Sequence, residues 1–461
     1  MASNTSKGKD LDGQWWKSLP AITSPFPSTE LNKPIDLIED RLDVFFSNQT
    51  FREDQKTHLS VNGRIYLDWL PKLRFGFVFE ESSPQDVNRV RVASLGIDAN
   101  ATNIGYSLPL DANTVPTQMC KFTDDVVWGK GKGKHTAYII FHIPNFLSHG
   151  GHFIDQTQIH SDGNSKLTWR WILEAKDWRI AIDTVNGVNF DALKKKNGFQ
   201  ITHVGRLERA DGKLFSGNDG IEVLNALGYF LSFARGAWTH PFLFYGYNQE
   251  GHHVWGVFHK PPLSPYKNDK SWLIWNDPNF ISHAWIEFWE KWKEKNWRET
   301  LRICIAWYLE SLNSNFVEKS LVLTLAAFER LFWQVIEEEK QITTSNPSDA
   351  SGKIRELLSV SGVKPSVPSV LRSLSHLLKR ENKKSNKVDD GAHIYTWLRN
   401  GITHPNAKNL KRLTKSSKQA VVEAARMANW WLEECMLKQL RYSGLYISTV
   451  DGRMRDKRNI S

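Results

Sequence analysis

The chain has 461 residues, of which 40% are hydrophobic and 24% are charged. This length suits two or three domains, and the composition is ordinary for a globular protein, which argues against a disordered or fibrous chain. No apolar run reaches the ~18 residues of a membrane span, and the N-terminus lacks the apolar stretch of a signal peptide. Cys120, Cys304 and Cys435 lie too far apart for a thiolate zinc motif. We therefore expect a cytoplasmic protein without membrane contact.

The net charge of +10 is concentrated in the last third of the chain. Residues 301–461 hold 26 Lys and Arg against 16 Asp and Glu, whereas residues 1–300 hold 34 of each. A basic segment beside a neutral one indicates a polyanionic partner, most simply a nucleic acid. A merely solvated basic surface is the alternative.

The first part of the chain is predicted to be rich in strands. Residues 1–34 are polar and contain four prolines, which indicates an arm laid over the surface. Residues 35–265 form a β-rich domain whose turns are Asn62-Gly63, Asp211-Gly212 and residues 248–251. One helix, 220–235, interrupts a largely antiparallel sheet or sandwich. The predicted strands are 63–70, 72–80, 90–98, 136–143, 166–174, 178–183, 199–208, 242–247 and 254–259.

Eleven histidines are scattered over this β-rich domain. None of them sits on a predicted helix with an acidic partner at metal-site spacing. We therefore expect structural or surface histidines, no metal and no cofactor.

The second part is predicted to be helical, so that the whole chain is an α+β protein. Residues 266–300 are a linker with a Trp-rich helix, 301–443 a bundle of about five helices, and 444–461 a basic tail whose end, 453–458, is expected to be disordered. The aromatic stripe from Trp285 to Trp292 indicates a core-facing side. The predicted helices are 282–312, 315–340, 354–360, 367–378, the segment that ends near residue 400, and 419–439.

One motif in this helical part carries possible chemistry: Arg399, Asn400 and His404, followed by Pro405. An Arg binds a phosphate through a charged fork of donors, and a His moves protons near neutral pH. Gly401 is expected to end the helix in a left-handed conformation, which would leave Arg399 in the last turn and His404 beyond it. Such a pair would let a metal-free ribonuclease hold a phosphate and activate a ribose 2′-hydroxyl.

A second Arg and His pair has the same spacing. Arg235 and His240 are also followed by proline, but Gly236 replaces the polar residue. We expect Arg235 to be a helix C-terminal cation with a structural role.

The pattern Arg, polar residue, three residues, His within a C-terminal helical bundle resembles the HEPN superfamily, and the layout is similar to its Apea-like branch. The resemblance implies an all-α HEPN-like bundle and a metal-independent endoribonuclease that cleaves single-stranded or loop RNA, with tRNA anticodon loops as the family-level expectation. It assigns catalytic roles to Arg399, His404, Asn400 and Glu329. It also implies a homodimer through the helical domain, a role in abortive anti-phage defence, and a phage-derived trigger sensed by the β-rich domain.

A basic run after the motif is expected to contact RNA and consists of Lys408, Lys411, Arg412, Lys415 and Lys418. Two other functions remain open. The helical domain would be a non-catalytic RNA- or nucleotide-binding module, or the β-rich domain would bind a carbohydrate or peptide while the helices dimerise it.

Overall fold

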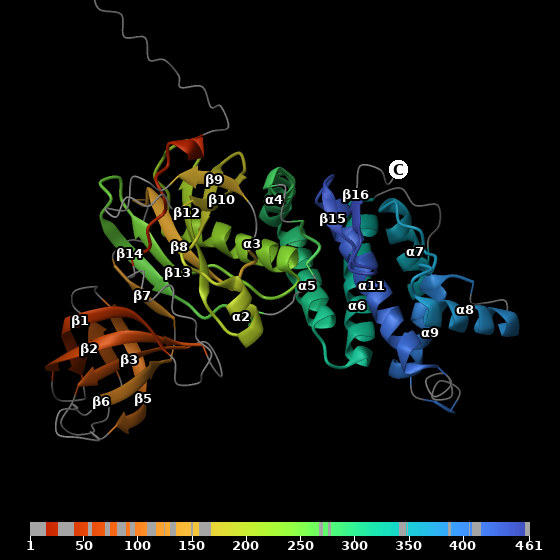
Figure 1. The fold of residues 1–461 in the computed structure, drawn as a ribbon, viewed down its shortest axis with the longest axis horizontal. Helices are drawn as coiled ribbons and strands as arrows, with labels where there is room; N and C mark the ends of the chain where they lie inside the picture. The colour runs from red at the N-terminus through yellow and green to blue at the C-terminus, as the bar shows by residue number, and fades with distance from the viewer. Residues whose placement is uncertain are drawn as a thin grey trace, which may run out of the picture. The chain divides into compact units, whose positions relative to one another are not determined.

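The computed structural model divides the chain into two compact units (Figure 1). The first unit contains residues 1–220 and 241–261, and the second contains residues 221–240 and 262–461. The first is rich in strands and the second in helices, so the predicted α+β class holds at this level. The structure describes residues 15–25, 41–53, 58–69, 74–80, 89–92, 97–107, 117–123, 125–129, 135–148, 151–155, 167–266, 271–274, 278–340, 347, 349–385, 389–404, 406–407 and 416–456.

Six antiparallel strands of the first unit close into a barrel. Their order around it is β1 (Arg41–Glu53), β2 (His58–Asp68), β3 (Arg74–Glu80), β6 (Thr117–Phe122), β5 (Ile97–Ser107) and β4 (Arg89–Val92), which pairs again with β1.

One predicted turn lies inside this barrel instead. Gly63 belongs to β2, where it pairs with Ser47 of β1 and Phe79 of β3. The register of β1 against β2 shifts between Ser47 and Thr50, so Asn62-Gly63 marks an irregular place in a continuous strand. A glycine in a strand often marks such a bulge, and the prediction of a turn was wrong.

Eight further strands form one antiparallel sheet, which confirms the predicted pairing direction. Central strands are apolar because both their faces are covered: six of the seven residues of β8 are buried. The predicted turns at Gly212 and Gly251 are present, each with a positive φ. The order is β7 (Val126–Trp128), β14 (His253–Phe258), β13 (Phe242–Tyr247), β8 (Tyr138–Pro144), β12 (Ile201–Arg209), β11 (Trp178–Thr184), β10 (Leu167–Glu174) and β9 (His152–Asp155). A short helix, α2 (Phe190–Lys196), precedes β12.

The described part of the N-terminal arm, residues 15–25, is fixed to this sheet by a buried ion pair. Arg170 on β10 and Asp183 on β11 lie 2.6 Å apart, and both are almost fully buried. The guanidinium also donates to the carbonyl oxygens of Trp16, Leu19 and Pro20. Buried charges need such saturation, so the arm completes the solvation of Arg170.

The second unit is built from helices. They are α3 (Gly217–Arg235, whose first four residues belong to the first unit), α4 (Pro278–Lys293), α5 (Lys295–Leu312), α6 (Val317–Phe332), the π-helical turn η2 (Trp333–Glu338), α7 (Ala350–Val360), α8 (Arg372–Ser385), α9 (Gly391–Thr403) and α11 (Lys418–Gln439). None of the described helices is long and apolar enough to cross a lipid bilayer.

The apolar periodicity of this unit predicts its core well. The predicted face of α6 is buried along its whole length, from Leu321 through Phe328 to Phe332, and the aromatic stripe of α4 is buried too. The predicted helix 282–312, however, is two helices, because Glu294 adopts an extended backbone and starts α5. The first residues of predicted helix 367–378, around Pro368, are not helical, since α8 begins at Arg372.

Of the segment 453–458, which was predicted to be disordered, residues 453–456 are ordered, and 457–458 lie outside the described residues. Strands β15 (Leu445–Ile447) and β16 (Met454–Asp456) form a small hairpin. Arg455 pairs with Asp451 and lies over the ring of Trp430, and Tyr446 donates to Glu434. Because Trp430 and Glu434 belong to α11, these contacts attach the hairpin to that helix.

Candidate active site

Helix α9 carries the motif and is anchored at its start. Asp390 caps it by accepting a hydrogen bond from the backbone N–H of His393 at 2.9 Å, a strong helix-start signal. Arg355 of α7 donates to the same carboxylate at 2.6 Å. The buried face of α9, which includes Ile394, Tyr395 and Leu398, packs into the helical unit. Because the start and the buried face of α9 are both fixed, the helix holds its C-terminal end, which carries the motif, in place.

The end of α9 differs from the prediction in one respect. Gly401 is helical and buried, and the helix continues to Thr403, so Gly401 is not a left-handed cap. His404 ends the helix with φ −116° and ψ 83°, while its N–H still donates to the carbonyl of Asn400 at 3.1 Å. The residue before a proline is pushed toward such extended conformations, so Pro405 accounts for the stop.

The structure brings the predicted cation and imidazole together. Nη1 of Arg399 lies 3.4 Å from Nε2 of His404, although five residues of ideal helix would separate them by about 140°. The non-helical backbone of His404 and the length of the Arg side chain close that gap. Nη1 also donates to Oδ1 of Asn400 at 3.2 Å. All three predicted residues therefore meet at one helix end.

The contact between Arg399 and His404 has a defined donor. A guanidinium can only donate, so in this contact Nε2 of His404 is the acceptor. His404 is exposed, and Arg399 is half-buried with its Nε enclosed and given no acceptor among the described residues. A stronger acceptor, such as a phosphate oxygen, could replace Nε2 of His404 as the partner of the Arg399 Nη groups.

Tyr395 links the motif to Glu329. Its hydroxyl donates to the carbonyl of Leu321 at 2.8 Å and lies 2.7 Å from Oγ1 of Thr324. Burial raises the pKa of the Tyr395 hydroxyl; the Thr324 hydrogen bond and the Arg399 cation lower this pKa, and Glu329 raises it. Glu329 is exposed on α6. Among the described residues, no hydrogen bond or ion pair joins Glu329 to Arg399 or His404.

Of the predicted basic run, the structure describes only Lys418. This residue is exposed at the first position of α11, whereas Lys408, Lys411, Arg412 and Lys415 lie outside the described residues.

A second basic surface, which we call the α8 surface, was not predicted. It consists of the exposed side chains of Arg372, Lys379, Arg380, Lys383 and Lys384 on α8. Arg380 and Lys384 pair with Glu381 on the same helix. Glu423 of α11 accepts from the N–H of Leu374 and fixes the start of α8. The sequence signal was the density of Lys and Arg between 372 and 384.

The rival pair, Arg235 and His240, is structural, as expected. Arg235 ends α3, is fully buried, and donates to the carbonyls of Trp238 and Pro265 at 2.9 Å. His240 is 5% exposed and packs against Gly228 and the edge of Tyr229. A substrate phosphate has no access to either group.

Three possible metal ligands, Asp389, Asp390 and His393, cluster at the other end of α9. The guanidinium of Arg355 already lies among them, 2.6 Å from Asp390 Oδ2 and 2.6 Å from His393 Nδ1. The atoms that could bind a metal therefore accept hydrogen bonds from the guanidinium of Arg355 instead.

The histidines of the first unit have structural surroundings. His142 is buried between Ser24 and the carbonyl of Leu243, and His152 stacks on Trp16.

Comparison with known proteins finds similarity to YopA proteins in parts of both units. Residues 131–269 match the YopA central domain, and residues 294–458 match the YopA C-terminal domain. The chain resembles YopA proteins. It is 24% identical over 449 residues to the SPbeta prophage-derived protein YopA of Bacillus subtilis (strain 168), in an alignment that covers 93% of this chain and 95% of that protein. No solved structure matches the chain.

The resemblance to the HEPN superfamily was wrong. The segment with Arg399 and His404 falls within the match to the YopA C-terminal domain, and no HEPN family matches. An Arg, polar, x3, His pattern is short enough to arise without common descent. The geometry of the pair itself remains, while the expected role in anti-phage defence loses the resemblance on which it rested.

Proposed function

We propose that the helical unit is a metal-independent endoribonuclease in which Arg399 and His404 carry out the reaction. The supporting observation is the 3.4 Å approach of a guanidinium to an exposed imidazole. Both groups sit at the end of a helix whose other face is packed in the core, so they are held in place before a substrate arrives.

The reaction would use the ribose 2′-hydroxyl as the nucleophile. A substrate phosphate would attract the Nη groups of Arg399 away from Nε2 of His404, and this frees the imidazole lone pair. His404 would take the proton of the 2′-hydroxyl while its oxygen forms a bond to phosphorus. The bond from phosphorus to the 5′-oxygen then breaks, and that oxygen takes a proton from solvent. The products are a 2′,3′-cyclic phosphate and a 5′-hydroxyl.

The neighbouring groups have supporting roles in this proposal. Arg399 would neutralise the charge that develops on the phosphate oxygens, usually the largest electrostatic contribution. Asn400 would keep the guanidinium oriented through its Oδ1, which already accepts from Nη1. Glu329 would act at a distance, because its charge and that of Arg399 both influence Tyr395.

Basic side chains of the helical unit support RNA as the partner. The net charge of +10 belongs to residues 301–461, and Lys418 begins the helix that comes after the motif. The α8 surface adds five exposed cations in the same unit. Phosphate contacts of this kind supply sequence-independent affinity that decreases with salt. Single-stranded or loop RNA is the substrate class that we propose.

The experiment is a cleavage assay on total RNA in the presence of EDTA. Wild type should cleave RNA and leave DNA of the same sequence intact, since DNA lacks the 2′-hydroxyl. Arg399→Ala and His404→Ala should each lower the cleavage rate by about 100-fold or more, the usual effect of removing a catalytic donor or base. His283→Ala, which removes an exposed histidine of α4, is the matched control and should cleave like wild type.

Two results would contradict the proposal. If wild type binds RNA without cleaving it, and both variants bind as well, the unit is a non-catalytic RNA-binding module that uses the same basic surface. If Arg399→Ala and His404→Ala cleave like wild type, the activity lies elsewhere in the chain.

Dimerisation through the helical unit and a phage-derived trigger on the β-rich unit stay predictions, and both lose the HEPN resemblance on which they rested. A dimer would bring a second Arg and His pair into one cleft if the two-fold axis passes near α9. Light scattering on wild type and on variants of exposed α9 residues would test it.

A further inference from the structure

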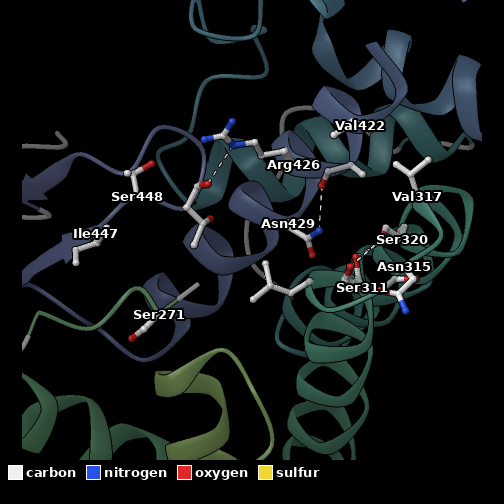
Figure 2. Close-up of a pocket in the computed structure, with 15 residues that line it drawn as sticks. Ser271, Ser311, Asn315, Val317, Ser320, Val422, Arg426, Asn429, Ile447 and Ser448 are labelled. Atoms are coloured by element: carbon white, nitrogen blue, oxygen red, sulfur yellow. Dashed lines mark hydrogen bonds between the residues drawn. The ribbon is translucent and has the colours of Figure 1, made fainter. Parts of the chain in front are cut away.

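A cavity of about 670 Å³ lies in the helical unit and contains none of the motif residues. Its walls come from the turn between α5 and α6, from α11, from the C-terminal hairpin, and from Ser271 (Figure 2). This volume is in the range of sites for small molecules. The lining includes one basic residue, Arg426, and no acidic one.

One face of α11 supplies the polar side of the cavity. Val422, Arg426 and Asn429 recur at intervals of four and three residues, so their side chains lie on the same side of the helix. Nε of Arg426 donates to the carbonyl of Thr449 at 3.4 Å, which ties the side chain to the hairpin. The two Nη groups remain as a fork of donors, suited to a carboxylate or phosphate.

Asn429 lines this cavity and carries an acceptor that no described residue uses. The side chain is only 5% exposed, and its Nδ2 donates to the carbonyl of Ala425 at 3.1 Å. A carbonyl oxygen can only accept, so the amide cannot be turned around, and Oδ1 must point the other way. Oδ1 is enclosed and has no hydrogen-bond partner among the described residues (Figure 2). A buried acceptor without a partner costs stability, about 1–3 kcal/mol in general.

The hydroxyl groups of Ser311 and Ser320, which also line the cavity, offer acceptors as well. Ser320 donates its only hydroxyl hydrogen to the carbonyl of Ser311 at 2.7 Å, and Ser311 donates to the carbonyl of Ser320 at 3.3 Å. Their oxygens keep lone pairs that can face a ligand. Ser311, Ser320 and Asn429 therefore add acceptors to the wall, with the cation of Arg426 beside them.

We infer that this cavity binds a small anion that also carries N–H or O–H donors. Its carboxylate or phosphate would take the fork of Arg426, and its donors would satisfy Oδ1 of Asn429 and the oxygens of Ser311 and Ser320. The apolar remainder, which includes Leu312, Val317 and Ile447, would cover an uncharged part of the ligand. Amino acids and nucleoside monophosphates both have this chemistry.

The test is a thermal-shift and calorimetric screen of the full chain with two panels, the twenty amino acids and the ribonucleoside 5′-monophosphates. At least one compound should raise the melting temperature, and the panel that contains it identifies the source. Acetate and inorganic phosphate, which lack the second set of donors or the apolar part, should give no comparable shift.

Two variants keep the result interpretable. Asn429→Leu has a similar shape and removes the acceptor, and Arg426→Gln removes the fork; each should weaken binding by about tenfold or more. Asn429→Leu should melt no lower than wild type without ligand, because it eliminates an unsatisfied buried group. Arg441→Gln removes an exposed Arg that pairs with Glu287, and it should bind like wild type.

The inference is overturned if neither panel binds to wild type, or if a compound binds equally well to wild type, Asn429→Leu and Arg426→Gln. RNA cleavage is measured separately, and since the cavity and the α9 site share no residue, failure of one proposal leaves the other standing.

Discussion

The chain contains two Arg and His pairs with the same spacing, and their environments are opposite. Arg235 lies at the end of α3 and is fully buried, its donors taken up by backbone carbonyls. Arg399, at the end of α9, is half-buried and gives its Nη1 to Asn400 and to the exposed His404. Spacing alone therefore does not separate a structural pair from a reactive one.

The two arginines differ in the groups that surround their guanidinium ends. After α3, Gly236 takes a positive φ, and the loop at Ser264 and Pro265 closes over the guanidinium. At the end of α9, the described residues bring only the side-chain amide of Asn400 and the imidazole of His404 to Arg399. An Arg that is surrounded by carbonyls stabilises the fold, whereas one that shares its donors with an imidazole can exchange them for a substrate.

The largest effect is expected at the buried pair. Arg235→Leu should destabilise the helical unit by about 3–5 kcal/mol, because the carbonyls of Trp238 and Pro265 lose their donor in a buried site. Urea unfolding followed by tryptophan fluorescence measures the loss. A change below about 1 kcal/mol would mean that water replaces the guanidinium and that the environments of the two pairs are more alike.

At the exposed pair the expected effect is on rate instead of stability. Arg399→Lys keeps the charge but loses the planar fork, so cleavage of RNA should fall by about tenfold, less than the loss for Arg399→Ala. The melting temperature should change little, since Arg399 makes only two side-chain hydrogen bonds to described residues. Single-turnover rates would decide; full activity of the Lys variant would show that charge alone is sufficient.

Lowering the pH should reduce the stability of the fold through a third histidine, His142, because this side chain is buried. Burial lowers the pKa of His142 to about 3, while the hydrogen bond to the Leu243 carbonyl raises it slightly. The unfolded chain then binds one more proton between pH 6.5 and 3, so stability is complete above pH 6.5 and is lost as the pH falls. At pH 5 this loss is about 2 kcal/mol.

His142→Gln provides the control, because an amide of similar reach does not titrate. Its unfolding free energy, measured in urea at pH 7 and pH 5, should fall by about 2 kcal/mol less than that of wild type between the two values. Equal losses in both proteins would show that His142 is protonated in the folded state.

The smallest effect is expected at Tyr395, which precedes Arg399 by about one turn of α9. Tyr395→Phe removes a hydroxyl that bonds to Leu321 and Thr324, and it should cost about 1 kcal/mol of stability. Cleavage per folded molecule should stay near that of wild type, since Tyr395 is fully buried and its hydroxyl bonds to Leu321 and Thr324. A strong loss of rate without a loss of stability would instead make Tyr395 part of the reacting group.

Periodic patterns predicted the elements that have one clear environment. The apolar face of α6 and the aromatic stripe of α4 are buried as expected, because helical spacing maps directly onto a face. Local signals failed where tertiary pairing overrules them: Asn62-Gly63 has the composition of a turn but lies within β2. The break at Glu294 likewise has no glycine or proline to announce it.

The two candidate sites differ in the same way. Arg399, Asn400 and His404 are close in sequence, so a local pattern was enough to propose that they meet. The cavity at Asn429 is assembled from residues near 271, 311, 426 and 449, and no local pattern joins them. Its clue, an acceptor without a partner among the described residues, exists only in the folded chain.

The most direct measurement of the proposed reaction tracks the 2′-hydroxyl. Wild type is incubated in EDTA with an RNA loop that it cleaves and with the same RNA carrying a 2′-O-methyl group at the cleaved position, and the product ends are identified by mass spectrometry. We predict cleavage of the unmodified RNA alone, with a 2′,3′-cyclic phosphate end that is absent for His404→Ala. Cleavage of the methylated RNA at that position, or a 3′-hydroxyl end, would contradict the proposed reaction.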